Sequence, residues 1–365
     1  MLRRLRIQGF RSIKDQEINL TALNVLIGTN GAGKSNLVSF FDMLSFLKTG
    51  ALQEYVARNG SADSLLHFGS KATPILSFTI EFAVANGINQ YEARLAHAAG
   101  DTLIFVDEHV AYQRAGGPLR TTPLGAGHSE SKLESARQHG DKTAANILWQ
   151  LQRCNPYHFH DTSAQSRIRN KVYIEDNKYL RSDAGNLAAY LFRLARQVPD
   201  TYQRIVHTVR QIVPDFDDFE LAPSVLDPQS VLLNWRQKSR DFLFGPHHFS
   251  DGTLRVIALT AALHQPSSQS PSLTVIDEPE LGLHPYAIAV IAAIMRSAAS
   301  TGQIVASTQS TTFLDQFEPS DVVVIDRNSG ASEFKRPDPE ALKDWLSEYS
   351  MSELWQKNVI GGRPA

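Results

Sequence analysis

Residues 28–35 read Gly-Thr-Asn-Gly-Ala-Gly-Lys-Ser, which matches the pattern G-x-x-x-x-G-K-[ST] of a phosphate-binding loop. Glycines in such a loop let consecutive backbone N–H groups turn toward a phosphate, because no Cβ stands in the way. In this pattern Lys34 reaches the β- and γ-phosphates, and the hydroxyl of Ser35 binds Mg²⁺. We therefore expect ATP and Mg²⁺ at this loop, with nucleotide contacts from Asn30, Gly31, Ala32, Gly33, Lys34, Ser35 and Asn36.

The residues around the loop give it the setting that such a loop requires. Residues 23–27 form a short apolar run that is typical of a buried strand. After the loop, Leu37, Phe41 and Leu44 recur at helical spacing, and Gly50 ends the segment. Strand, glycine loop and helix in this order argue against a chance match.

A second candidate segment lies far along the chain. Residues 273–278 read Leu-Thr-Val-Ile-Asp-Glu, an apolar strand that ends in two carboxylates. Adjacent carboxylates at such a strand end are costly unless they serve a cation. We interpret the two segments as halves of one nucleotide site.

The composition is that of an ordinary soluble globular protein. The 365 residues are 42% hydrophobic and 20% charged, enough for a sizeable core. The net charge of -2 does not indicate a nucleic-acid-binding protein, although a local basic patch stays open. The single cysteine fits a reducing cytosol, and neither a signal peptide nor a membrane span is evident. We expect a cytoplasmic protein without membrane contact.

The order of elements predicts an α/β fold. Residues 2–8 alternate as a half-buried edge strand, and residues 75–114 read as an antiparallel meander followed by a loop over 116–131. The middle of the chain is mostly helical, and a βαβ series follows from residue 251. The expected divisions are an N-terminal lobe, a mostly helical insertion, a C-terminal lobe and a final helix with its tail, at 1–131, 132–245, 246–337 and 338–365.

Two further motifs accompany the acidic strand. Phe249-Ser250-Asp251-Gly252-Thr253 precedes an apolar helix that Ser250 can cap, and the helix N-terminus favours an anion. Ser307-Thr308-Gln309-Ser310 follows the next predicted strand. Phosphate loop, serine–glycine helix cap, Asp-Glu pair and a polar residue after the next strand is the order found in ABC-type ATPase heads.

On these motifs the chain resembles the RecF/SMC-like ATPases, and among them the compact AAA-family ATPases related to the OLD proteins of bacterial defence systems. The opening residues 9–13, the tail residues 352–358 and the stretch 361–364 are similar to the same family. The long separation between Ser35 and Ser250 favours this branch over transporter ATPases. The resemblance implies a P-loop NTPase fold, with an ABC-type head, an antiparallel β-subdomain and a mostly helical insertion.

The resemblance also implies roles for individual residues. Asp277 would hold Mg²⁺ through water, and Glu278 would polarise or deprotonate the attacking water. Ser250 and Gly252 would contact the γ-phosphate bound to a second copy, so that two heads enclose two nucleotides in a two-fold homodimer. Lys34 and Gln309 complete the expected catalytic set, and Arg11 and Ser12 are expected near the nucleotide.

The sequence departs from the common ABC pattern at several positions. Asp251 stands where glycine is usual, and Thr253 stands where glutamine is usual. The switch position holds Gln309 rather than histidine, and glutamine can hydrogen-bond but cannot titrate. Slow or partner-gated turnover is therefore expected. No glutamine loop is located, because Gln53 lies too early in the chain.

Other clusters carry weaker signals. His158-Phe159-His160-Asp161 has no fourth ligand at a usual spacing, so a zinc site is not expected, and His247-His248 are interpreted as loop residues. A loose basic run is interpreted as a solvated face, with a nucleic-acid contact as the alternative. It consists of Arg167, Arg169, Lys171, Lys178 and Arg181.

Three functions remain open on the sequence alone. The first is a sensor or switch ATPase in a bacterial antiphage module, acting on an effector or nuclease partner that docks on the insertion or on the Trp345/Trp355 tail. Too few residues follow Gln309 for the Toprim nuclease domain that OLD-like proteins carry. The second is a DNA-repair or chromosome-associated ATPase that acts on DNA directly. The third is a scaffold that binds ATP without hydrolysing it.

Overall fold

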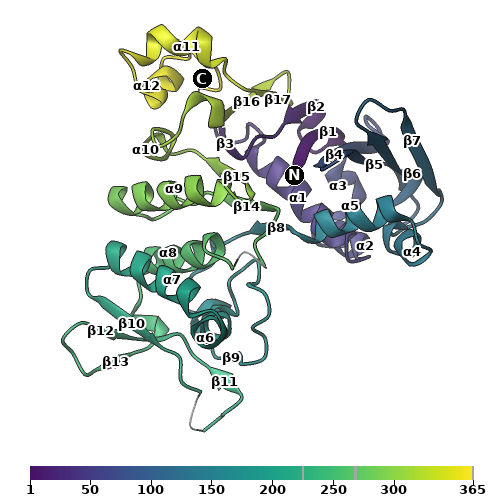
Figure 1. The fold of residues 1–365 in the computed structure, drawn as a ribbon. Coiled ribbons are helices and arrows are strands. Elements are labelled where there is room, and N and C mark those ends of the chain that lie inside the picture. The colour runs from purple at the N-terminus through teal and green to yellow at the C-terminus, as the bar shows by residue number, and fades with distance from the viewer. Residues whose placement is uncertain (224–225, 267–268, 364–365) are drawn as a thin grey trace.

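A computed structural model describes residues 1–223, 226–266 and 269–363. Pro364, the last residue of the tail stretch 361–364 noted in the sequence, lies outside these ranges. Within them two six-stranded sheets lie side by side (Figure 1). The first is antiparallel, in the order β2-β1-β4-β5-β6-β7. Its strands are β1 (Leu2–Phe10), β2 (Ile13–Asn19), β4 (Ile75–Val84), β5 (Gly87–Ala98), β6 (Thr102–Arg114) and β7 (Leu119–Gly125).

The second sheet is the centre of the molecule and has the order β17-β16-β3-β15-β14-β8. Neighbouring strands are parallel, except that β17 is antiparallel to β16. Its strands are β3 (Leu23–Ile27), β8 (Cys154–Tyr157), β14 (Leu273–Asp277), β15 (Gln303–Thr308), β16 (Val322–Asn328) and β17 (Ala331–Lys335). The α/β fold class predicted from the sequence is confirmed.

Helices cover both faces of the central sheet. Helix α1 (Lys34–Leu47) packs on the face to which Val275 and Val305 point. Helices α8 (Asp251–Leu263) and α9 (Pro285–Ala299) pack on the opposite face with Ile276 and Ile304. Because both faces are covered, β3, β14 and β15 are buried along almost their whole length rather than on alternate residues only.

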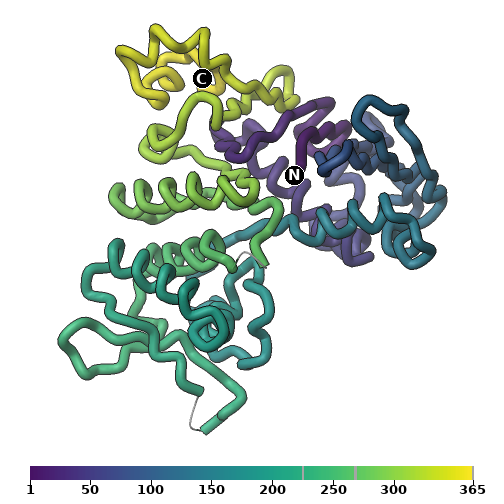
Figure 2. Tube along the Cα trace, in the orientation of Figure 1, coloured from purple at the N-terminus to yellow at the C-terminus, as the bar shows by residue number. Residues whose placement is uncertain are grey.

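A lobe beyond α8 contains only the later part of the predicted helical insertion, from about residue 172 on, whereas residues 133–157 lie against or within the two large sheets (Figure 2). It is built from α6 (Leu187–Gln197), α7 (Pro199–Ile212) and the small strands β9 (Val172–Tyr173), β10 (Phe216–Glu220), β11 (Ser230–Val231), β12 (Asn234–Gln237) and β13 (Leu243–Phe244). Pro199 opens α7 because a proline is tolerated where the amide has no helical acceptor. The ring of Trp235 stacks on Phe249, just before α8, and thereby joins the lobe to that helix.

The remaining helices brace the two sheets. Helices α2 (Leu52–Arg58), α3 (Ser61–Leu65), α4 (Leu133–Gln138) and α5 (Lys142–Gln152) lie against the antiparallel sheet, and α10 (Thr311–Leu314), α11 (Pro339–Leu346) and α12 (Met351–Gln356) lie at the other end of the molecule (Figure 1). Trp355 is buried there and its Nε1 donates to Gly362 O at 2.9 Å, whereas Trp345 is exposed. Of the two tryptophans expected to receive a partner, only Trp345 is accessible.

Three local expectations are wrong. Strand β1 pairs on both sides, with β2 and β4, so it is not an edge strand. The expected loop over 116–131 contains β7, whose side chains are mostly exposed and therefore show no apolar alternation. The mostly helical stretch contains β8, which pairs with β14, but four residues with a proline are too short for a periodic signal.

Across the described residues, no helix is long and apolar enough to cross a membrane.

Gln303, the first residue of β15, ties the two sheets together. Its Oε1 accepts from the Leu2 amide at 2.6 Å, and its Nε2 donates to Leu2 O at 2.8 Å and to Thr21 O at 3.1 Å. The side chain is 2% exposed, so these groups have no water to replace a lost partner.

We expect Gln303→Leu to lower the free energy of unfolding by about 1–3 kcal/mol, because it leaves buried backbone groups unpaired. Urea denaturation followed by circular dichroism measures the change. Gln203→Leu on the exposed side of α7 is the matched control and should stay within about 0.5 kcal/mol of wild type. Equal stability of the two variants would contradict the proposed tie.

Candidate functional site

The candidate site lies where the central parallel strands end. The register pairs Asp277 with Ser307 and Ile27 with Thr308, so β14, β15 and β3 finish at the same edge. The phosphate-binding loop follows β3, Glu278 follows β14 and Gln309 follows β15. Ligands of open α/β sheets bind at this carboxyl edge, and the structure brings both predicted halves of the site to it.

Backbone geometry of the phosphate-binding loop depends on its glycines. Gly31 and Gly33 have φ of 79° and 119°, in the region that favours glycine. A Cβ on Gly33 would lie 2.0 Å from Ser332 Oγ and 2.8 Å from Ser12 Oγ. Lys34 Nζ donates to Gly28 O at 2.7 Å and Thr29 O at 3.0 Å, so the lysine folds back over its own loop. Asn30 and Ser35 are exposed at the loop surface.

A small hydrogen-bond network of Ser332, Ser12 and Asn36 supports the phosphate-binding loop. Ser332 on β17 donates to Ala32 O at 2.5 Å and lies 2.6 Å from Ser12 Oγ. Asn36 Nδ2 donates to the same Ser12 hydroxyl at 2.6 Å. Ser12 therefore lies beside the loop, as expected, in a bracing position. Arg11 instead donates to Asn59 Oδ1 at 2.7 Å.

Asp277 is the half-buried last residue of β14. Its Oδ1 accepts a short hydrogen bond from Ser307, and its Oδ2 lies 3.7 Å from His160 Nε2. Burial disfavours the carboxylate, but the contacts with His160 and Ser307 outweigh it and hold the pKa of Asp277 below its usual value. The carboxylate is thus ionised at neutral pH and suited to a cation.

Glu278 and Gln309 contact one another directly. Gln309 Nε2 donates to Glu278 Oε1 at 2.6 Å, and the Glu278 amide donates to Ser307 O at 3.0 Å. Glu278 has φ of 46°, a left-handed backbone that is uncommon outside glycine. The turn lifts its carboxylate away from the strand and beside the switch-position amide.

Glu280 belongs to the site although its role was not predicted. It is 9% exposed, and its Oε1 accepts from Thr308 Oγ1 at 2.5 Å and from the Gln309 amide at 3.4 Å. Oε2 has no partner within the part of the chain that the structure describes. Burial raises the pKa of Glu280 above its usual value. The run Asp-Glu-Pro-Glu was the available signal, since its third carboxylate follows only two residues after Glu278.

Lys34 and the three carboxylates interact electrostatically. Burial lowers the pKa of Lys34, and the charges of Glu278, Asp277 and Glu280 oppose that shift in this order. The lysine of the loop and the acidic strand end therefore lie within electrostatic reach. The residues present fit Mg²⁺ and a triphosphate, because a glycine cradle, the buried Lys34, an exposed Ser35 hydroxyl and an ionised Asp277 meet at one edge.

The serine–glycine motif lies at the start of α8. Ser250 is exposed, and its Oγ accepts from the Thr253 amide at 3.1 Å as the helix cap. Gly252 lies against the loop after β14, and a Cβ there would come within 2.6 Å of Gly282 O. Asp251, at the unusual position, pairs with Arg169 at 2.8 Å. Among the described residues, the hydrogen bonds of the Ser250 side chain stay within its own helix.

Arg169 contradicts the interpretation of the basic run as a solvated face. Its side chain is 7% exposed and donates to Thr162 O, Pro246 O and Phe249 O, so it fastens the segment before α8. Arg167 and Arg181 pair with Asp183 and Asp176, at 3.6 and 2.8 Å. Within this run, Arg169 therefore has a structural role, and the charges of Arg167 and Arg181 are offset by aspartates.

Two histidines that the sequence analysis singled out, without expecting a metal site, lie at this edge. Strand β8 ends beside Asp277, and His158 and His160 follow this strand. His158 Nε2 contacts Asp42 Oδ1 at 2.8 Å, and this bond raises the pKa of His158. Gln53, by contrast, donates to Leu103 O and Ser129 O, which are not part of the candidate site. The sequence analysis did not predict strand β8, and without its pairing to β14 the position of the two histidines beside Asp277 could not be predicted.

Comparison with known proteins finds two family models that match parts of this chain. A family model described as "AAA ATPase domain" matches residues 1–109, and one described as "AAA domain, putative AbiEii toxin, Type IV TA system" matches residues 151–315. A comparison with curated proteins finds no match.

Two solved structures share the fold over nearly the whole chain. A crystal structure of the Smc head bound to the C-winged helix domain of ScpA has a TM-score of 0.61 at 14% identity, covering 94% of this chain and 99% of that chain. An Smc head with an extended coiled coil, bound to the C-terminal domain of ScpA derived from Pyrococcus furiosus, has a TM-score of 0.56 at 12% identity and covers 95% and 98%. The fold is that of an SMC ATPase head; a relationship to OLD proteins is not established by these matches.

We expect Gly33→Ala to weaken binding of MgATP at least about 100-fold, because the new Cβ would displace Ser332 and distort the loop. Titration with a fluorescent ATP analogue measures the affinity. Gly50→Ala is the control: its φ of 70° is also positive, but no atom lies within 4 Å of the added Cβ. Tight nucleotide binding by Gly33→Ala would contradict the assignment of the loop.

Proposed function

We propose that this chain is an ATPase that binds MgATP, hydrolyses it and uses the cycle to switch a partner protein. The supporting observation is the meeting of Lys34, Asp277 and Glu278 at one sheet edge, although they are remote in sequence. The two ATPase-type family matches cover the two segments that supply these residues.

Each residue has a defined task in this proposal. The loop amides and Lys34 bind the phosphates, while Ser35 and Asp277 hold Mg²⁺, Asp277 through water. The ion, when bound, neutralises charge on the phosphate oxygens. Glu278 accepts a proton from the attacking water, and Gln309 keeps the Glu278 carboxylate in position. Gln309 donates a hydrogen bond but takes no proton, so we expect slow turnover that a partner can accelerate.

Two copies of the chain enclose the nucleotides in this proposal. Ser250 is exposed at the N-terminus of a helix and its side chain bonds only to Thr253 among the described residues, so it is free to meet a phosphate from outside. Gly252 holds this helix start against Gly282, in the loop that follows Glu278. Each nucleotide would then lie between the loop of one copy and the helix start of the other.

The switched partner is proposed to belong to a bacterial antiphage module. Two observations support a protein partner: the similar Smc heads were solved with a domain of ScpA, and Trp345 is exposed at the C-terminal end. The family description for residues 151–315 names a toxin–antitoxin system, which is a setting for a switch of this kind. Direct action on DNA is less favoured, because Arg169 is buried and two of its basic neighbours are paired.

We expect Glu278→Gln to lower the ATP turnover rate about 100- to 10,000-fold, because the water loses its proton acceptor, while MgATP still binds. Phosphate release measures turnover, and light scattering with ATP should show the variant as a dimer. Glu348→Gln, an exposed glutamate before α12, is the control and should behave as wild type. Normal turnover in Glu278→Gln would refute the proposed base.

Mixing two inactive variants tests whether the sites are completed between copies. Lys34→Ala lacks a working phosphate loop, and Ser250→Arg lacks a working helix start. A mixed dimer holds one site with both parts intact, so the mixture should regain turnover that neither variant shows alone. A mixture as inactive as its components, with monomers in every nucleotide state, would rule out the shared site.

A further inference from the structure

The segment after β8 presents two histidines whose rings lie close together. Ring nitrogens of His158 and His160 lie within 4.8 Å of one another, whereas Phe159 between them is buried. Phe159 is 7% exposed and its ring lies 5.5 Å from Tyr157, whereas the histidine side chains are 35% and 38% exposed. The buried phenylalanine thus anchors two accessible imidazoles.

The backbone of this segment is fixed from two directions. The His158 amide donates to Ser182 O at 2.9 Å. Arg255 of α8 donates from Nε to Phe159 O at 3.2 Å and from Nη2 to His160 O at 2.9 Å. The imidazoles therefore stand on a supported loop, as a preformed binding site requires.

Asp277 joins the two histidines to make a set of three candidate ligands. One ligand atom from each of His158, His160 and Asp277 lies within 4.8 Å of the others. Ser307 occupies Oδ1 of Asp277, and Oδ2 faces His160 Nε2 at 3.7 Å. The third ligand comes from β14, far along the chain, which is why the spacing of residues 158–161 alone did not predict a metal site.

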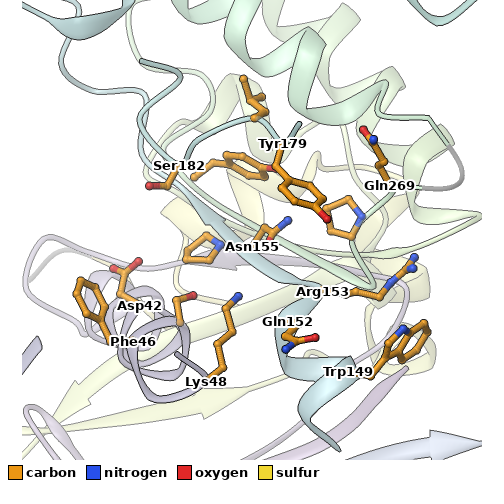
Figure 3. Close-up of a pocket in the computed structure, with 15 residues that line it drawn as sticks. Asp42, Phe46, Lys48, Trp149, Gln152, Arg153, Asn155, Tyr179, Ser182 and Gln269 are labelled. Atoms are coloured by element: carbon orange, nitrogen blue, oxygen red, sulfur yellow. The ribbon is translucent and has the colours of Figure 1, made fainter. Parts of the chain in front are cut away.

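A second carboxylate orients one of the imidazoles. His158 Nε2 donates to Asp42 Oδ1 at 2.8 Å, the carboxylate–histidine pairing that commonly supports metal ligands. With the proton on Nε2, Nδ1 is the ring atom with a lone pair for a cation. Asp42 also lines a cavity of about 750 Å³, together with Lys48 and Tyr179 (Figure 3).

We propose that His158, His160 and Asp277 bind a first-row transition-metal dication such as Mn²⁺, Co²⁺ or Zn²⁺. Two imidazole nitrogens and one carboxylate suit these ions, whereas Mg²⁺ prefers oxygen ligands. Three protein ligands leave at least one coordination position open. This site is additional to the Mg²⁺ site of the proposed ATPase, with which it shares Asp277, and it does not depend on hydrolysis.

Titration of the nucleotide-free, full-length protein with Co²⁺ tests the proposal, because visible absorption reports imidazole coordination of this ion. We expect one Co²⁺ per chain, retained in excess Mg²⁺. His158→Ala and His160→Ala should each weaken binding at least about 10-fold, and Asp42→Asn should weaken it about 10- to 100-fold through the lost orientation. His139→Ala, an exposed histidine at the end of α4, is the control and should bind as wild type.

Two results would overturn the proposal: absence of imidazole-bound Co²⁺ in the wild-type protein, or unchanged Co²⁺ affinity in both His158→Ala and His160→Ala with circular dichroism showing a native fold. Glu278→Gln separates this test from the proposed ATPase. It should bind Co²⁺ as the wild type does while turnover is lost, so a failed metal site leaves the ATPase intact and a failed ATPase leaves the metal site intact.

Discussion

The parallel pairing of β3, β15 and β14 is the constraint on which the site depends. It brings Lys34 to the same edge as Asp277, Glu278 and Glu280, although hundreds of bonds separate them along the chain. Three carboxylates so close together repel one another, and a cation among them relieves that repulsion. The lysine supplies one positive charge in the protein itself, and a divalent cation would offset more of the remaining negative charge.

The same edge is connected to the outer parts of the molecule by short contacts. Arg169 fastens the segment before α8, and Arg255 reaches from α8 to the backbone of residues 159 and 160. Gly252 places the helix start in contact with the loop that follows Glu278. The lobe that contains α6 and α7 is therefore joined to the site through packed, hydrogen-bonded segments. A ligand that shifts α8 would alter contacts both at the site and in this lobe.

Sequence reasoning predicted the motifs that local patterns encode, and it missed the features that depend on strand pairing and tertiary packing. Residues 23–35 and 273–278 carry strong signals, because glycine, lysine and paired carboxylates have few other reasons to occur in those settings. Strand β8 carries no periodic signal, yet its pairing with β14 decides where His158 and His160 lie. Arg169 looks like any surface arginine in sequence, and only tertiary packing shows that it is buried. The run Asp-Glu-Pro-Glu places Glu280 close to Glu278 in sequence, but only the structure shows that Glu280 is buried.

The position of Ile27 has a mechanical consequence. This last residue of β3, immediately before the phosphate-binding loop, packs in one hydrophobic cluster with Leu354, Trp355 and Ile360. Close-packed side chains transmit displacement because they have little free volume. A displacement of residues 351–360 would therefore be transmitted through this cluster to Ile27 and to the start of the loop.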